Sequence, residues 1–173
     1  MFERPFGRTD WGGFLAEQLG RNGRLFYRLA YGVLRDAQAA EDVCQQALLK
    51  AWERQAELRE AGSLRNWIAR VVLNESLQLR RRRKAEQRAL DRTAAEGEPR
   101  SGPDPSLEMK EAVLAAMEQL PEDVRLVVAM RLMQGVSGNE VKEMLGCSAA
   151  EVSRQLHRGM EMLRQSLADW QPA

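Results

Sequence analysis

Five consecutive cations, Arg80 to Lys84, form the strongest local charge feature of the sequence. They directly follow an apolar pattern of helical period that contains Trp67, so we expect them on the same helix. Five adjacent side chains cannot share one face of a helix, and some of them must therefore lie in solvent. Phosphates are natural counter-ions for such a strip, so a nucleic-acid surface and a merely solvated helix end are the two interpretations.

A second candidate surface lies near the C-terminus, around a glycine turn at Gly146. Ser137 and Ser148 each precede a glutamate by three residues, which is the pattern of a capping box at a helix start. The two boxes bracket a short helix, a tight turn and a longer helix, and this order predicts a helix-turn-helix.

In a helix-turn-helix the start of the second helix enters the major groove of DNA. The polar face expected there carries Ser153, Arg154, His157 and Arg158. Because Glu143, Glu151 and Glu161 make the local charge neutral, we expect a weak or partner-assisted contact with DNA. A helical hairpin that only packs is the alternative.

Catalysis and metal binding have little support in the sequence. His157 is the one histidine, there is no glycine-rich phosphate loop, and no serine or cysteine has a base beside it in sequence. Cys44 and Cys147 lie far apart without a CxxC pattern, so we expect neither a disulfide nor a zinc site but two small core residues. The sequence therefore predicts no enzyme, no metal and no cofactor.

Apolar residues recur at helical spacing throughout the N-terminal half. The period continues through 25–34, 43–52 and 64–72, and we find no period-two pattern of a strand. Ser63 is expected to cap the third of these helices. Trp52 and Trp67 fall on apolar faces and are expected in the core.

A segment rich in proline and glycine, Thr93 to Ser106, separates this half from a second helical pattern. Beyond it, residues 107–117 predict one helix, and Pro121 at a first-turn position opens another that ends before Gly135. We therefore expect an all-α fold of two small helical domains, 1–92 and 107–173, joined by a flexible linker at 93–106.

Composition limits the class of protein. The 173 residues carry 26 basic and 25 acidic side chains with 44% hydrophobic residues, as in a folded globular chain. The charge is uneven, +6 over residues 1–95 and −5 over residues 96–173, and the basic half favours a polyanionic partner. Without a membrane-spanning run or a secretory signal, we expect no membrane insertion and a cytoplasmic location.

The order of these features resembles that of the extracytoplasmic-function (ECF) sigma factors, which are bacterial transcription initiation factors of the sigma-70 type. The resemblance lies in AAEDVCQQALLKAW (39–52), in SLRNWIARVVLNESLQLRRRRK (63–84) and in the run from QLPEDVR to QLHR (119–158). It implies two helical domains, called region 2 and region 4, and covers about residues 24–167.

The resemblance also implies roles for particular residues. The helix with Asp42, Gln45, Gln46, Leu49 and Lys50 would dock on core RNA polymerase. The melted strand of the minus-ten promoter element would bind Glu60, Gly62, Ser63, Arg65, Asn66, Arg70, Asn74, Arg80, Arg81, Arg82, Arg83 and Lys84. The minus-thirty-five element would face Glu151, Ser153, Arg154, His157 and Arg158. The implied mechanism is physical: an unstacked base enters a pocket and phosphate contacts offset the cost of opening the duplex.

The partners implied are core RNA polymerase, promoter DNA and an anti-sigma factor. The recognition helix lacks a Thr, a Lys and two Arg of the family pattern and gains only Arg154, so we expect minus-ten recognition to be the stronger of the two. Two alternatives remain: a helical regulator without promoter recognition, and a helix-turn-helix repressor that acts without polymerase.

Overall fold

The structure, a computed structural model, describes residues 11–60, 64–93 and 105–168, and every regular element among them is helical. The N-terminal half comprises α1 (Trp11–Leu34), α2 (Ala37–Glu53), α3 (Gln55–Glu60) and α4 (Leu64–Thr93). The C-terminal half comprises α5 (Pro105–Glu118), α6 (Glu122–Val128), the π-helix η1 (Ala129–Met133), α7 (Gly138–Leu145) and α8 (Ala149–Ser166). The predicted all-α fold with a helix-turn-helix is therefore confirmed.

Helices α1, α2 and α4 pack together because each presents an apolar stripe of helical period. Phe26, Leu29 and Val33 of α1 are buried, at the i, i+3 and i+7 spacing of one helix face. The chain reverses between α1 and α2 at Arg35, whose φ of 55° is left-handed, and Asp36 then caps α2 by accepting a hydrogen bond from the Ala39 amide at 3.1 Å. The expected capping residue of α4, Ser63, lies outside the described residues.

The C-terminal half is built on the contact of α6 with α8. Gly159 of α8 faces α6 so closely that an added Cβ would lie 2.4 Å from Val128 Cγ2. The turn between α7 and α8 is made by Gly146, whose φ of 65° is a conformation that favours glycine. Pro121 lies at the N-cap of α6, one position earlier than predicted, and the helix begun there widens into η1 before Gly135.

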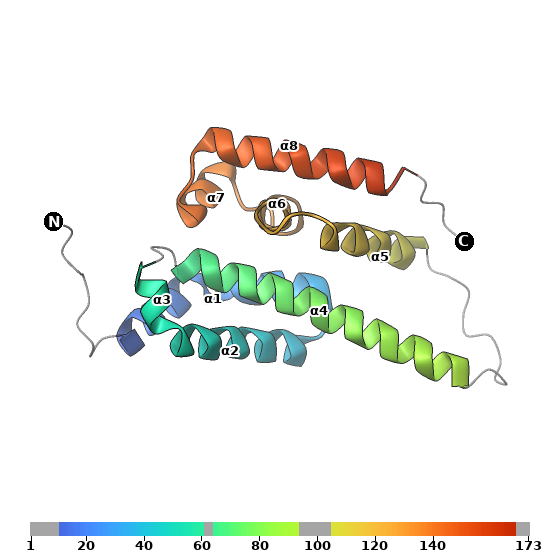
Figure 1. Cartoon of the computed structure of the whole chain (residues 1–173), viewed down its shortest axis with the longest axis horizontal. Helices are drawn as coiled ribbons and strands as arrows, with labels where there is room; N and C mark the ends of the chain where they lie inside the picture. The colour runs from blue at the N-terminus through green and yellow to red at the C-terminus, as the bar shows by residue number, and fades with distance from the viewer. Residues whose placement is uncertain (1–10, 61–63, 94–104, 169–173) are drawn as a thin grey trace.

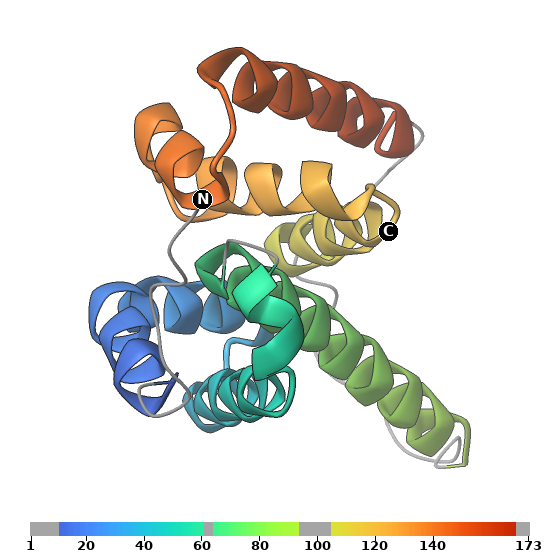
Figure 2. The ribbon, with the colours of Figure 1, turned by 60° about the vertical axis from the view of Figure 1, so that its left-hand side comes forward.

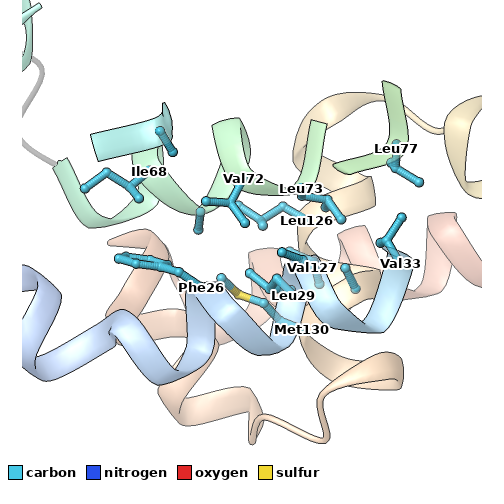
Figure 3. Packing of buried hydrophobic residues seen from close by; sticks show 14 of the residues in the cluster. Phe26, Leu29, Val33, Ile68, Val72, Leu73, Leu77, Leu126, Val127 and Met130 are labelled. Atoms are coloured by element: carbon cyan, nitrogen blue, oxygen red, sulfur yellow. The ribbon is translucent and has the colours of Figure 1, made fainter. Parts of the chain in front are cut away.

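The two halves lie against each other, with α1 and α4 facing the C-terminal half and α2 on the far side (Figures 1 and 2). Their buried residues form one continuous cluster, in which Leu126, Val127 and Met130 lie among side chains of α1 and α4 (Figure 3). The predicted domain boundaries stay predictions. The predicted linker falls mostly on residues 94–104, outside the described residues, while Thr93, Pro105 and Ser106 belong to helices.

Candidate nucleic-acid and protein interfaces

The basic run on α4 divides by position around the helix. Arg81, Arg82 and Arg83 are exposed, as predicted for part of the run, whereas Arg80 is only 9% exposed and Lys84 is half-buried. Arg83 turns back to the start of α2, where its Nη1 lies 2.9 Å from Asp36 Oδ2. Arg82 has no ion-pair partner within the described ranges. Among the residues that the structure describes, the run therefore presents one cation without a carboxylate partner, Arg82, and four that have one.

Two glutamates of α5 neutralise the side of this run that faces the C-terminal half. Arg80 Nη1 and Lys84 Nζ lie 3.0 Å and 2.8 Å from Glu111 Oε2. Glu118, seven residues later on the same face of α5, lies 3.7 Å from Arg80 Nη2 and 3.9 Å from Arg81 Nε. Burial raises the pKa of Glu111, but the hydrogen bond from Lys84 and the nearby cations outweigh it, so the pKa of this carboxyl is lowered.

The N-terminal part of α4 is engaged in the same way. Arg70 lies 2.5 Å from Asp123 Oδ1 through Nη2 and 3.7 Å from Glu122 Oε1 through Nη1, while its Nε donates to Asn66 Oδ1 at 3.0 Å. Arg65 donates to the carbonyl oxygen of Glu143 in α7, and burial lowers the pKa of its guanidinium. The predicted residues Gly62 and Ser63 lie outside the described residues, and for Glu60 only the backbone, at the end of α3, is described.

Asn74 contacts a cation that the sequence did not suggest. Arg125 of α6 donates from Nη1 to Asn74 Oδ1 at 2.8 Å and from Nη2 to the carbonyl oxygens of Glu118 and Leu120. Burial lowers the pKa of Arg125. No sequence signal pointed to Arg125. For the carboxylate partners of the basic run, the one signal was the seven-residue spacing of Glu111 and Glu118, which places both on one helix face.

The outer face of α2 carries most of the residues predicted to dock on polymerase. Asp42, Gln45, Gln46 and Leu49 are exposed, and Lys50 pairs with Glu75 of α4 at 2.6 Å. This face borders an open groove lined by Leu15, Gln45, Leu48, Leu49 and Trp52.

Trp52 corrects one prediction, because it is 50% exposed and not in the core. The inner stripe of α2 consists of Val43 and four alanines, so the helices approach closely, and the indole instead lies at the edge of the stripe over Gly12. Trp67 is half-buried against the core, as are Cys44 and Cys147.

The second helix of the helix-turn-helix, α8, presents the predicted polar face. Ser153, Arg154, His157 and Arg158 are all exposed. The capping box at Ser137 is complete, but at Ser148 only half of it forms. The Glu151 side chain is engaged by Arg154 and, at 2.8 Å, by Gln155, and these two hydrogen bonds lower its pKa. The one cation gained in this helix is therefore paired with a carboxylate of the same helix.

Comparison with known proteins decides the family. A profile described as Sigma-70 region 2 matches residues 19–86, and one described as Sigma-70, region 4 matches residues 110–163. The ECF RNA polymerase sigma factor SigM of Mycobacterium tuberculosis is 30% identical over 155 residues, which are 85% of this chain and 74% of SigM. The chain belongs to the ECF sigma factors. It is therefore not an enzyme, as the sequence predicted.

Other similar proteins agree in kind. The probable RNA polymerase sigma factor RfaY of Xanthomonas campestris is 31% identical over 80% of this chain, although the chain spans only 36% of RfaY. A chain in the solved complex of the sigma factor RpoE with the anti-sigma factor NepR from Bartonella quintana is also similar. The match includes 90% of this chain and 98% of that chain, with 20% sequence identity and a TM-score of 0.45. A likeness at that level bears on neither partners nor function.

Within this ECF sigma factor, region 2 spans most of α1 and continues through α2 and α3 into α4, and region 4 extends from α5 into α8. Among the described residues no group of His, Cys, Asp and Glu is arranged to hold a metal ion. The helices of that part of the chain include none that is long and apolar enough to cross a membrane.

Proposed function

We propose that this sigma factor binds core RNA polymerase and directs it to promoters in transcription initiation, in the cytoplasm where both partners are found. The observation that carries the proposal is the presence, in one chain that matches regions 2 and 4, of an uncovered polar and apolar face on α2, a basic strip on α4 and an exposed recognition face on α8. A repressor that acts without polymerase needs neither of the first two.

Each face has a proposed partner. Asp42, Gln45, Gln46, Leu49 and Lys50 dock on polymerase, and Leu49 and Trp52 add apolar area that is exposed in the free chain. The α4 residues from Arg65 to Lys84 bind the melted minus-ten strand through phosphates and stacked bases. Glu151, Ser153, Arg154, His157 and Arg158 face the minus-thirty-five duplex. An anti-sigma factor is a further proposed partner, supported by family membership alone.

The pairing of Arg154 with Glu151 favours a second candidate, a helical regulator that binds polymerase but does not recognise a minus-thirty-five element. An arginine whose guanidinium already has a carboxylate partner must give it up before it can contact a phosphate or a base.

Co-purification with core polymerase, followed by transcription from a library of random promoter fragments, separates these functions. Binding with transcripts that share upstream motifs supports the sigma factor, binding without transcription supports the regulator, and no binding contradicts both. Leu49→Asp should weaken co-purification at least tenfold. Leu132→Asp on η1 is the matched control, because the two leucines are similarly exposed, 55% and 52%, on different faces.

A further inference from the structure

The face of α4 proposed for the minus-ten strand is also the face that lies against the C-terminal half. Arg70, Arg80 and Lys84 form ion pairs with residues of α5 and α6, and Asn74 accepts a hydrogen bond from Arg125 of α6. Arg65 is bonded to α7. Five of the described residues proposed to bind the strand are thus already bonded to residues of the C-terminal half.

The contact has the packing of a protein interior beneath these polar pairs. Leu73 of α4 and Leu126, Val127 and Met130 of the C-terminal half are each at most 1% exposed. At the edge, Arg28 and Gln134 exchange two hydrogen bonds, from Arg28 Nη2 to the Gln134 carbonyl at 2.7 Å and from Gln134 Nε2 to the Arg28 carbonyl at 3.0 Å. Apolar burial persists in salt, so this contact does not depend on the ion pairs alone.

The proposed binding faces of α2 and α8 are not covered by the described residues of the opposite half. Leu49 and Trp52 on α2 are about half exposed, and Arg154 and Arg158 on α8 are exposed. Helix α2 lies on the side away from the C-terminal half, and α8 lies on the side away from the N-terminal half (Figures 1 and 2). Contact between the halves therefore covers the proposed strand-binding face of α4 but not the proposed binding faces of α2 and α8.

We propose that contact between the two halves, here called the closed arrangement, inhibits binding of the minus-ten strand and no other proposed function. Glu111 and Glu118 of α5 form ion pairs with cations of α4 that strand phosphates would otherwise contact. The halves must therefore separate before the strand binds. This inference rests on the proposed function of α4. Polymerase docking at α2 needs no separation, so it can precede opening of the chain. A phosphate competes here with a carboxylate already in place, and a base cannot reach Asn74 while Arg125 lies against it.

Gly32 offers a way to open the chain without touching any proposed binding residue. It lies in the last turns of α1, and an added Cβ would be 2.8 Å from Gln134 Nε2 and 3.4 Å from Met133 Cε, both in the C-terminal half. Gly32→Leu would displace the Gln134 side chain and so break its hydrogen bond to the Arg28 carbonyl across the contact between the halves, and this variant is called the wedge. Gly20→Leu is the matched control, because nothing lies within 4 Å of a Cβ at Gly20 in the same helix.

The test measures the affinity of the full chain for a fluorescent single-stranded oligonucleotide at fixed salt. Gly32→Leu is expected to bind at least tenfold more tightly than the wild type, and Gly20→Leu to bind as the wild type does. Circular dichroism checks that each variant is folded, and small-angle scattering checks that the wedge is more extended. A folded, extended wedge with wild-type strand affinity would overturn the proposal.

A second pair of variants tests the carboxylates themselves. Glu111→Gln with Glu118→Gln should raise strand affinity, and Glu41→Gln with Glu57→Gln, exposed carboxylates elsewhere that change the net charge equally, should raise it less. Equal gains in the two pairs would contradict a role for α5. Core-polymerase affinity should be the same for wild type and wedge, and a tenfold difference would contradict the selective form of the inference.

Failure of the inference and failure of the proposed function give different results. If the wild type binds the strand as tightly as the folded wedge does, the autoinhibition is wrong while strand binding stands. If the wedge, the glutamine variant and the wild type all fail to bind the strand, and holoenzyme starts no transcription, the proposed function of α4 is wrong.

Discussion

The arginines of the basic run differ in what they can do, although they are adjacent in sequence. Arg80 is buried and its Nε has no hydrogen-bond partner in the part of the chain that the structure describes, so its two ion pairs hold a charge that would be costly to leave alone. Arg81 and Arg82 are exposed, and exposed cations attract phosphates without such a cost. Arg81 and Arg82 are therefore the cations open to phosphates while the halves are in contact, and Arg80 and Lys84 would become available only when the halves separate.

Arg81→Ala together with Arg82→Ala is expected to weaken open-complex formation by the holoenzyme and to lower its salt slope by about two, one for each phosphate contact. The measurement is open-complex formation against salt concentration. Arg21→Ala with Arg24→Ala, exposed cations of α1, controls for the loss of charge. An unchanged slope in the Arg81 and Arg82 variant would contradict the minus-ten assignment.

The reactivity of the Cys44 thiol reports how far its sulfur is shielded from water. Desolvation and, second, the charge of Glu41 raise the pKa of the Cys44 thiol to about 11. Because thiolate is the reactive form, alkylation of Cys44 in a Cys147→Ser chain should be about 100-fold slower at pH 8 than for a thiol with a pKa of 9, at equal access. The rate should keep rising to about pH 11. A profile that levels off near pH 9 would show a solvated thiol.

At the scale of the element, Gly159 sets how closely α8 approaches α6. Gly159→Ala would place a Cβ 2.4 Å from Val128 Cγ2 and 2.9 Å from Val124 Cγ1, so the helices must shift. We expect a loss of about 1–3 kcal/mol in the free energy of unfolding, as for overpacked cores, measured by urea denaturation.

The matched control for this prediction is Gly20→Ala, also within a helix but in open space. Removing a helical glycine without a clash should stabilise the chain by roughly 0.5–1 kcal/mol. The two substitutions are chemically identical and should change stability in opposite directions. A Gly159→Ala chain as stable as the wild type would mean that α6 and α8 separate at little cost.

The helices themselves were predictable from sequence, because apolar period and capping residues are local. Ser137 and Ser148 cap their helices as predicted, and Gly146 makes the turn that the helix-turn-helix requires. Local signals did not predict which apolar residues stay exposed once the helices pack, or which hydrogen-bond partner a side chain takes. Trp52 has the right period but lies outside a stripe of alanines, and Glu151 has the spacing of a capping box but is taken by Arg154 and Gln155.

At the scale of the whole molecule, the sequence predicted candidate binding surfaces, which stay predictions, but not the contacts that these surfaces make within the chain. The resemblance predicts minus-ten contacts on α4, and the opposite net charges of the two halves can be counted from the sequence. That α5 and α6 lie on this strip could not be predicted, since Arg80 and Glu111 are 31 residues apart and Asn74 and Arg125 are 51 apart. Pairing over such separations depends on how the helices pack, which no local pattern encodes.

The continuous core also predicts how the whole chain unfolds. Side chains of both halves share one buried cluster, so neither half keeps its full core when the other is lost, and we expect a single cooperative transition. In a Trp170→Phe chain the remaining tryptophans lie in α1, α2 and α4, so fluorescence reports the N-terminal half while circular dichroism reports all helices. Their urea midpoints should coincide in this chain and separate when Gly32→Leu is added, because the wedge uncouples the halves. Separate midpoints without the wedge would show that the contact between the halves contributes little to stability, and autoinhibition by that contact would then be too weak to matter.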